Sequence, residues 1–157
     1  CSVLVVRHPE EGLRHATDAV RVTLAHDGSA SATEAVRQMG EVDWPAGSDV
    51  SLVNVIQRPA LLADDIPYDV YLTQSMQAAL DEAKTTLQSH FTTAQARVLE
   101  EVHVAGSILH FCSDNKTDIL VVGDTGQSAI SRFFIGSVSR FILHHAECSV
   151  WLVRKKP

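Results

Sequence analysis

Residues 118–139 read DILVVGDTGQSAISRFFIGSVS and combine three features that together indicate the fold. The first is an apolar run over 118–123 without polar alternation, which is typical of a strand buried on both faces of a parallel sheet. A glycine-containing loop follows over 123–126, and a helix is predicted over 136–146. In open parallel sheets ligands bind beyond the carboxyl ends of the strands, so this loop is a place to expect a site.

Similar apolar runs occur elsewhere along the chain and alternate with helical periodicity. Further strands are predicted over 21–26, 49–57, 97–103 and 149–154. Further helices are predicted over 29–39, 69–91 and 106–115. Ser31 and Glu34 predict a capping box at the start of the first of these helices. The alternation predicts an α/β fold, an open five-stranded parallel sheet with helices on both faces.

The composition is that of a single acidic globular domain. The 157 residues are 45% hydrophobic and 20% charged, with a formal net charge of −6. Such a charge gives no general attraction to phosphate backbones, so no nucleic-acid partner is predicted. The apolar runs are too short to span a membrane. Cys1, Cys112 and Cys148 form no CxxC pair, which is typical of a reducing compartment and predicts a cytoplasmic location.

A repeat links the two ends of the chain. Residues 1–7, CSVLVVR, and residues 148–154, CSVWLVR, are identical at five of seven positions. Because the offset of 147 residues is close to a domain length, we expect 1–7 to be the last strand of a preceding, similar domain. Residues 8–19 would then be a polar linker and residues 20–157 a second domain. The alternative is chance similarity between two short apolar strands.

The glycine loop after residue 122 has two interpretations of equal weight. In one, Gly123, Gly126 and Gly136 belong to a plain connection between a strand and a helix that needs glycine for turning. In the other, the glycines allow positive φ and a close approach of the backbone to an anion, and backbone N–H groups of the loop and the positive end of the next helix cradle a phosphate. Ser137 and Ser139 would add hydroxyl donors, and Arg132 would meet a terminal phosphate. Asp124 opposes an anion unless its side chain points to solvent.

Three separate motifs resemble the universal stress protein family. They are the spacing Gly123-x2-Gly126-x9-Gly136-Ser137, the turn Asp27-Gly28-Ser29 after the first strand, and the final segment VSRFILHHAECSVWLVR over 138–154. The resemblance covers residues 20–155 and implies a five-stranded parallel sheet of order 3-2-1-4-5, the fold of the HUP group. It also implies binding of an adenine nucleotide, typically ATP, with a divalent cation such as Mg²⁺ bridging the phosphates.

The same resemblance implies roles for individual residues. Asp27 would face the adenosine, and Val55 would offer backbone contacts to the adenine. Val122 and Gly123 would line the ribose and the α-phosphate. The phosphates would be held by residues of the loop and the helix start: Gly126, Gly136, Ser137, Val138 and Ser139. His26 departs from the small or apolar residue that is usual in the family at this place.

The leading functional prediction is a binding module, an ATP-binding universal stress protein domain that acts as a sensor or regulator of the stress response. The sequence shows no residue set for fast chemistry, so no catalytic or metal-ligating residues are assigned and ATP hydrolysis is expected to be slow at most. The alternative is a nucleotide-free half of a tandem protein. That half would mediate dimer-like assembly. Whether or not nucleotide binds, the resemblance implies a homodimer or tandem-domain pairing through the edge strand 149–154, and residues 3–7 are expected to lie beside that strand.

Overall fold

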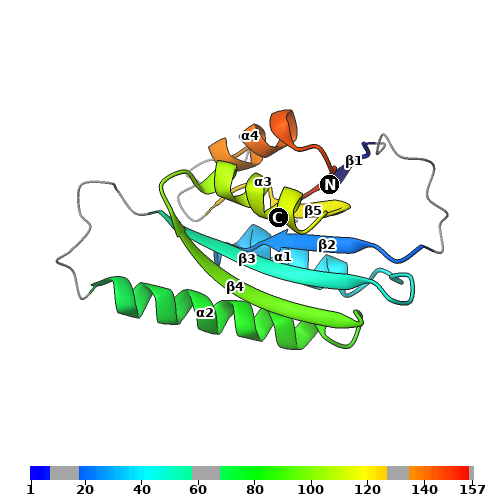
Figure 1. Cartoon of the computed structure of the whole chain (residues 1–157), viewed down its shortest axis with the longest axis horizontal. Coiled ribbons are helices and arrows are strands. Elements are labelled where there is room, and N and C mark those ends of the chain that lie inside the picture. Colours follow the sequence, from blue (N-terminus) through cyan, green and yellow to red (C-terminus); the bar gives the residue numbers. More distant parts are fainter. Residues whose placement is uncertain (8–17, 58–67, 127–134, 156–157) are drawn as a thin grey trace.

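The computed structural model describes residues 1–7, 18–57, 68–126 and 135–155 of the chain (Figure 1). The strands are β1 (Val3–Val5), β2 (Arg21–Ala25), β3 (Asp49–Gln57), β4 (Thr93–Glu101), β5 (Ile119–Gly123) and β6 (Ser149–Val153). The helices are α1 (Ala30–Met39), α2 (Tyr68–Leu87), α3 (Val104–Asp114) and α4 (Ser137–His145). From β2 onward this order confirms the predicted alternation of strands and helices.

The strands form one sheet in the order β1-β6-β5-β2-β3-β4. Strands β2 to β6 are parallel, and β1 runs antiparallel to β6. The prediction of a five-stranded, wholly parallel sheet is therefore wrong in its strand count, although the five parallel strands follow the order 3-2-1-4-5 when numbered from β2. The sixth strand confirms the expectation that residues 3–7 lie beside the strand at 149–154, because β6 has an outer edge of N–H and C=O groups with which residues 3–5 pair.

Two apolar clusters, one on each face of the sheet, make up the core. Side chains alternate along β5: Val121 belongs to the cluster under α1 and α2, whereas Leu120 and Val122 belong to the cluster under α3 and α4. Figure 1 shows α3 and α4 on one side of the sheet and α2 on the other. Because helices cover both faces, a ligand reaches the sheet at the loops beyond the strand ends.

Several local details differ from the sequence predictions: α2 ends at Leu87 rather than at 91, and α3 begins at Val104 rather than at 106. Strand β4 begins at Thr93 rather than at 97, because its nine residues pair in register with the whole of β3. The capping box is wrong: Ser29 is the N-cap of α1, and its Oγ accepts a hydrogen bond from the N–H of Ala32 at 3.1 Å. Gly28, with φ of +78°, makes the turn immediately before this N-cap.

The pairing of β1 with β6 has a local two-fold symmetry. Leu4 lies opposite Trp151, and these two residues occupy the same position of the sequence repeat. The two flanking pairs are Val3 opposite Leu152 and Val5 opposite Val150. In the repeat, Val3 is equivalent to Val150 and Val5 to Leu152, so each pair becomes the other when every residue is replaced by its equivalent. An isologous interface between two equal strands has this property.

The contacts at the two ends of the pair are also reciprocal. The Arg7 N–H donates to Ser149 Oγ at 3.1 Å, and the Arg154 N–H donates to Ser2 Oγ at 3.2 Å. Each arginine and each serine is the equivalent of the other in the repeat. The contacts at the two ends therefore follow the same two-fold register as the pairing of β1 with β6.

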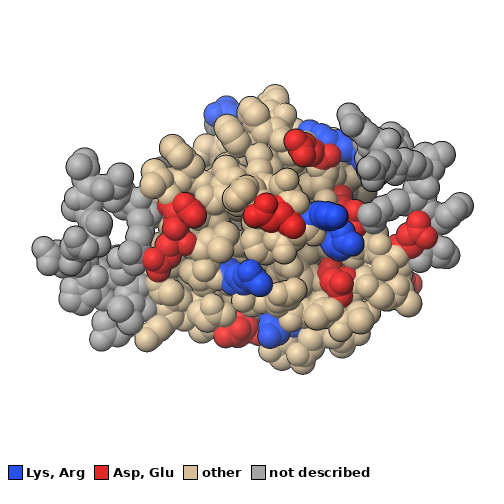
Figure 2. All heavy atoms as spheres, viewed as in Figure 1, with Lys and Arg blue, Asp and Glu red and all other residues tan. Residues whose placement is uncertain are grey.

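Two properties of the described residues concern their surface charge and the apolar length of their helices. On the face drawn in Figure 2, acidic and basic side chains are interspersed over the described residues. None of the described helices is long and apolar enough to cross a membrane.

Candidate functional site

A cavity of about 520 Å³ lies at the carboxyl ends of β2, β3 and β5. Its volume falls within the range of about 300–1,000 Å³ that is typical of small-molecule sites. Of the ten site residues predicted from the sequence, nine line this cavity: Asp27, Val55, Val122, Gly123, Gly126, Gly136, Ser137, Val138 and Ser139. The tenth, Arg132, lies outside the described residues.

The start of α4 supplies backbone donors to the cavity. Gly136 is the N-cap, and the Arg140 N–H makes a helical hydrogen bond to the Gly136 carbonyl at 2.9 Å. The N–H groups of Ser137, Val138 and Ser139 precede this bond, so they have no acceptor within the helix and form the positive end of its dipole. All three residues line the cavity. An anionic group in the cavity would meet these donors.

The two serines at the start of α4 differ in what their hydroxyl groups do. Ser139 is buried, and its Oγ–H donates to the Gly123 carbonyl at 2.6 Å. This bond ties the first turn of α4 to the end of β5. Ser137 is exposed. Of the two hydroxyl groups expected to donate to a phosphate, that of Ser137 is accessible, whereas Ser139 offers its backbone N–H.

Close packing, rather than an unusual backbone conformation, explains the glycines at the start of the loop. Gly123, Gly126 and Gly136 all have negative φ, so the expectation that a phosphate cradle here uses the positive φ of glycine is wrong. A Cβ on Gly123 would lie 2.8 Å from the Cβ of Ser31 in α1. A Cβ on Gly126 would lie 2.9 Å from Oδ2 of Asp27. Both glycines let other parts of the site approach the loop closely.

Asp124 neither points to solvent nor lines the cavity. Its side chain is only 6% exposed, and its Oδ2 accepts a hydrogen bond from Nε of Arg154 at 2.5 Å. Its Oδ1 accepts a hydrogen bond from Ser31 Oγ at 2.8 Å. The negative charge is therefore compensated away from the cavity, and the objection that Asp124 opposes an anion is removed.

His26 and Asp27 form the part of the cavity at the end of β2. Burial lowers the pKa of His26 below its ordinary value of 6.5, and the neighbouring Asp27 carboxylate partly opposes this effect. The His26 Nδ1 accepts a hydrogen bond from the Gly28 N–H at 3.3 Å, which places the proton of the neutral ring on Nε2. Among the described residues that line the cavity, His26 and Asp27 are the only ones with an acidic or basic side chain.

Sequence reasoning missed the apolar wall of the cavity. Leu72 and Met76 of α2 and Val104 and Ile108 of α3 form this wall. The apolar stripe along α2 was the available signal, but a stripe of this kind predicts only contact with the core. Leu72 and Met76 are half-buried, whereas Leu80 in the same stripe is fully buried. Only the packing shows which end of the stripe faces the cavity.

Solved structures share this fold. A universal stress protein from Archaeoglobus fulgidus in complex with dAMP has a TM-score of 0.62 at 19% identity, over 87% of this chain and 98% of that one. A family protein from Arabidopsis thaliana with AMP bound has a TM-score of 0.59 at 19% identity, over 87% and 92%. One from Burkholderia pseudomallei has a TM-score of 0.65 at 21% identity, over 85% and 94%.

The sequence comparisons extend over the same region. A relative from Staphylococcus haemolyticus that carries a universal stress protein name is 28% identical over 138 residues, which are 85% of this chain and 83% of the relative. The sequence profile of the Universal stress protein family matches residues 20–154, which include every parallel strand and every helix of the fold. The chain therefore belongs to the universal stress protein family.

Proposed function

We propose that the cavity binds an adenine nucleotide. The observation that carries the proposal is the convergence of the α4 start, the Asp27 carboxylate and an apolar wall on one space of about 520 Å³. The related structures that contain dAMP and AMP support it. The expected ligand is ATP, with Mg²⁺ as its counter-ion.

The residues at the β2 and β3 end fit the adenosine. The Asp27 carboxylate accepts hydrogen bonds and repels phosphate, so it suits the ribose hydroxyl groups. The backbone of Val55, at the end of β3, suits the polar edge of the base, while Met76 and Ile108 offer apolar contacts to its ring faces. Val122 and Gly123 would then lie along the ribose and the α-phosphate.

The residues at the start of α4 fit the phosphates. The N–H groups of residues 137–139 are suitable donors, together with the backbone of Gly126 and Gly136. Arg132 is proposed as the contact to the terminal phosphate. The described residues contain no group of three or more His, Cys, Asp or Glu that could hold a metal ion. We therefore expect Mg²⁺ to be held mainly by phosphate oxygens and water, as it commonly is.

We infer a regulatory role for the bound nucleotide, in the cytoplasm. Among the described lining residues the hydroxyl hydrogen of Ser139 is already donated to Gly123, and no serine or cysteine is hydrogen-bonded to a histidine. Occupancy of the cavity, rather than rapid turnover, would then be the signal. Hydrolysis of ATP is expected to be slow at most.

The test starts with the purified protein. It is denatured, any released nucleotide is identified, and the emptied protein is titrated with AMP and with ATP and Mg²⁺ by calorimetry. Gly136→Asp is the informative variant, because Asp is a favoured N-cap and its carboxylate repels phosphate from the same N–H groups. Gly136→Asn is the matched control, since Asn caps helices equally well without charge.

We expect Gly136→Asp to lose at least about tenfold in ATP affinity relative to Gly136→Asn, which corresponds to about 1.4 kcal/mol. Equal affinities of the two variants would place the phosphates elsewhere. No binding by the wild type at millimolar nucleotide would leave the second candidate function as the conclusion.

The second candidate is a structural half of a tandem protein that mediates dimer-like assembly. The observation that favours it is the two-fold register of β1 and β6. We propose on this basis that residues 1–7 are the last strand of a preceding similar domain, 8–19 a linker and 20–157 the present domain. Val3, Leu4, Val5 and Val6 are all exposed, as expected for a strand that continues into another domain.

Deletion of residues 1–7 tests this candidate. The deletion uncovers the edge of β6, which can then pair with β6 of a second copy in the same two-fold register. We expect a concentration-dependent monomer–dimer equilibrium by light scattering coupled to size-exclusion chromatography. A deletion variant that stays monomeric at all concentrations contradicts the candidate, whatever the result with nucleotide.

A further inference from the structure

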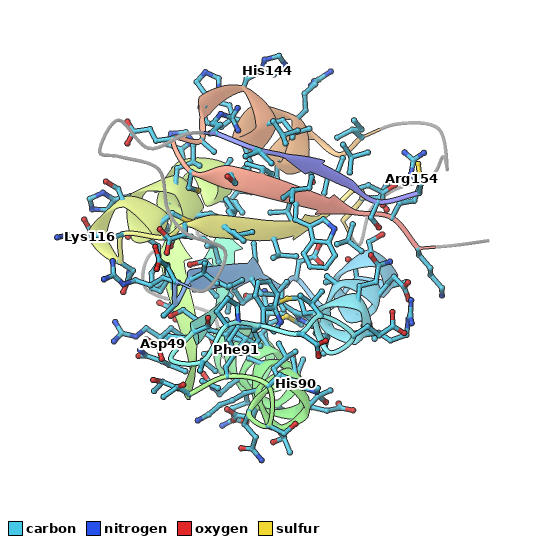
Figure 3. All side chains as sticks on the ribbon, turned by 90° about the vertical axis from the view of Figure 1, so that its right-hand side faces the viewer. Asp49, His90, Phe91, Lys116, His144 and Arg154 are labelled. Carbon is cyan, nitrogen blue, oxygen red and sulfur yellow. The ribbon has the colours of Figure 1, made fainter. Side chains whose placement is uncertain are left out.

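Arg154 lies where the glycine loop and the edge strand meet. It follows the last residue of β6, and Figure 3 shows it at that end of the strand. Its Nε donates to Asp124 Oδ2 in the loop at 2.5 Å. Its backbone N–H donates to Ser2 Oγ, just before β1, at 3.2 Å. One residue therefore contacts both the loop that lines the cavity and the segment that covers the sheet edge.

Asp124 fixes the course of the loop through its backbone as well as its side chain. Its N–H donates to the Val153 carbonyl at 2.7 Å, and its carbonyl accepts a hydrogen bond from the Gly136 N–H at 2.7 Å. The second of these bonds holds the N-cap of α4, whose first turn provides the backbone donors of the cavity. A shift of Asp124 would therefore move the donors, although Asp124 itself does not line the cavity.

Ser2 joins the edge segment to the body of the domain. The Ser2 hydroxyl group donates to Oε1 of Gln38 in α1 at 2.8 Å. Ser2 Oγ also accepts the hydrogen bond from the Arg154 N–H. Helix α1 also carries Ser31, whose hydroxyl group donates to Asp124. The loop, α1, β6 and the edge segment are thus linked by a continuous set of hydrogen bonds.

We propose that Arg154 is a positioning residue that couples nucleotide binding in the cavity to pairing at the β6 edge. With residues 1–7 in place, Arg154 is held against the buried carboxylate and the loop is ordered before the ligand arrives. Without them, the Arg154 N–H loses its bond to Ser2 Oγ, the side chain that reaches Asp124 is held less firmly, and binding must order the loop. Because binding couplings are reciprocal, nucleotide also strengthens the edge pairing. This inference rests on the proposed nucleotide site.

The experiment is a double-mutant cycle with two readouts. Nucleotide affinity is measured by calorimetry for the wild type, Ser2→Ala, Arg154→Gln and the double variant, and for Arg154→Lys as the conservative rescue. Ser2→Ala is chosen because it keeps the strand and removes only the hydroxyl group. In the absence of nucleotide, hydrogen exchange of the Gly136 amide reports the order of the loop independently of any ligand, since this N–H is bonded to the Asp124 carbonyl.

In the wild-type background, we expect Ser2→Ala to weaken nucleotide binding and to speed hydrogen exchange at the Gly136 amide. In the Arg154→Gln background, we expect Ser2→Ala to change neither quantity much further. Couplings of this kind typically change affinity by about 5-fold to 150-fold, and we expect the lower end. Arg154→Lys should restore part of the coupling, because an ammonium group retains the charge.

The outcomes separate this inference from the proposed site. If Ser2→Ala changes nucleotide affinity and Gly136 exchange by the same amounts in the wild-type and Arg154→Gln backgrounds, the coupling is overturned. The wild type could bind no nucleotide while exchange at its Gly136 amide still responds to Ser2→Ala, and does so only when Arg154 is present. That result would overturn the proposed ligand and would establish the coupling between the loop and the edge segment. Unchanged exchange at Gly136 in every variant overturns the coupling even when nucleotide binds.

Discussion

Gly123→Ala tests the conclusion that close packing, rather than backbone conformation, requires glycine at the end of β5. The added Cβ would lie 2.8 Å from the Cβ of Ser31 and 3.3 Å from the backbone N of Ala32, where ordinary van der Waals contact begins at 3.4 Å. The neighbouring atoms are the Cβ of Ser31 and the backbone of α1, none of which can move by rotation of a flexible side chain. The helix itself must therefore move away from β5. Overpacking of this kind costs about 1–3 kcal/mol.

A part of that cost is offset in the unfolded chain. Replacing glycine by alanine where φ is not positive stabilises a protein by about 0.4–1 kcal/mol, because the unfolded chain loses freedom. We therefore expect a net loss of about 1–2 kcal/mol in the free energy of unfolding. For a domain of this size, that lowers Tm by about 2–8 °C. Thermal unfolding followed by calorimetry, checked by urea denaturation, measures both quantities.

The second substitution of the cycle identifies the cause. Ser31→Gly removes the Cβ that clashes, whereas Ser31→Ala keeps this Cβ and removes only the hydroxyl group. We expect Ser31→Gly to cost less in the Gly123→Ala background than in the wild type, with a coupling of at least about 0.5 kcal/mol, and Ser31→Ala to be additive. A Gly123→Ala variant with the Tm of the wild type, or equal costs of Ser31→Gly in both backgrounds, refutes the packing argument.

Three further predictions concern single groups around the site. Ser29→Ala removes the N-cap hydrogen bond to the Ala32 N–H and should cost about 1 kcal/mol in urea denaturation, whereas no change would mean that another group caps α1. Ser139→Ala leaves the Gly123 carbonyl without its hydroxyl donor and should cost about 1–3 kcal/mol by the same assay, unless water replaces the bond without loss. Because burial lowers the pKa of His26, the folded protein takes up a proton at this ring less readily than the unfolded chain. The stability that the buried neutral ring contributes is therefore complete above pH 6.5, and it is lost as the pH falls below that value towards the folded-state pKa. His26→Gln should therefore lose less stability than the wild type between about pH 7.5 and about pH 5.5, and parallel losses would exclude this histidine as the cause.

Local periodicity was enough to predict most of the elements, since burial of apolar residues depends on the pattern along one segment. The run at 119–122 is apolar at every position, and β5 is covered on both of its faces. The start of β4 was missed by four residues, because residues 93–96 form a strand by pairing with β3, and nothing in their own composition requires it.

The glycine loop shows how far a motif can be interpreted. Its spacing placed Gly123, Gly126 and Gly136 at one site, and all three line the cavity. The physical reason for glycine at these positions was predicted wrongly. Positive φ can be proposed from a single residue, whereas the close contact of Gly123 with Ser31 joins segments 92 positions apart and depends on the fold. The compensation of Asp124 by Arg154 was missed for the same reason.

By itself, the sequence determined the α/β class, the limits of most elements, the glycine loop after β5 that lines the cavity, and the equivalence of residues 1–7 with 148–154. Each of these follows from patterns within a short window or from direct comparison of two windows. Only the tertiary structure decided that β1 runs antiparallel to β6 with a two-fold register, that Leu72 and Met76 face the cavity, and that Arg154 joins the loop to the edge. These features depend on which distant segments become neighbours, and strand pairing and helix packing settle that choice when the chain folds.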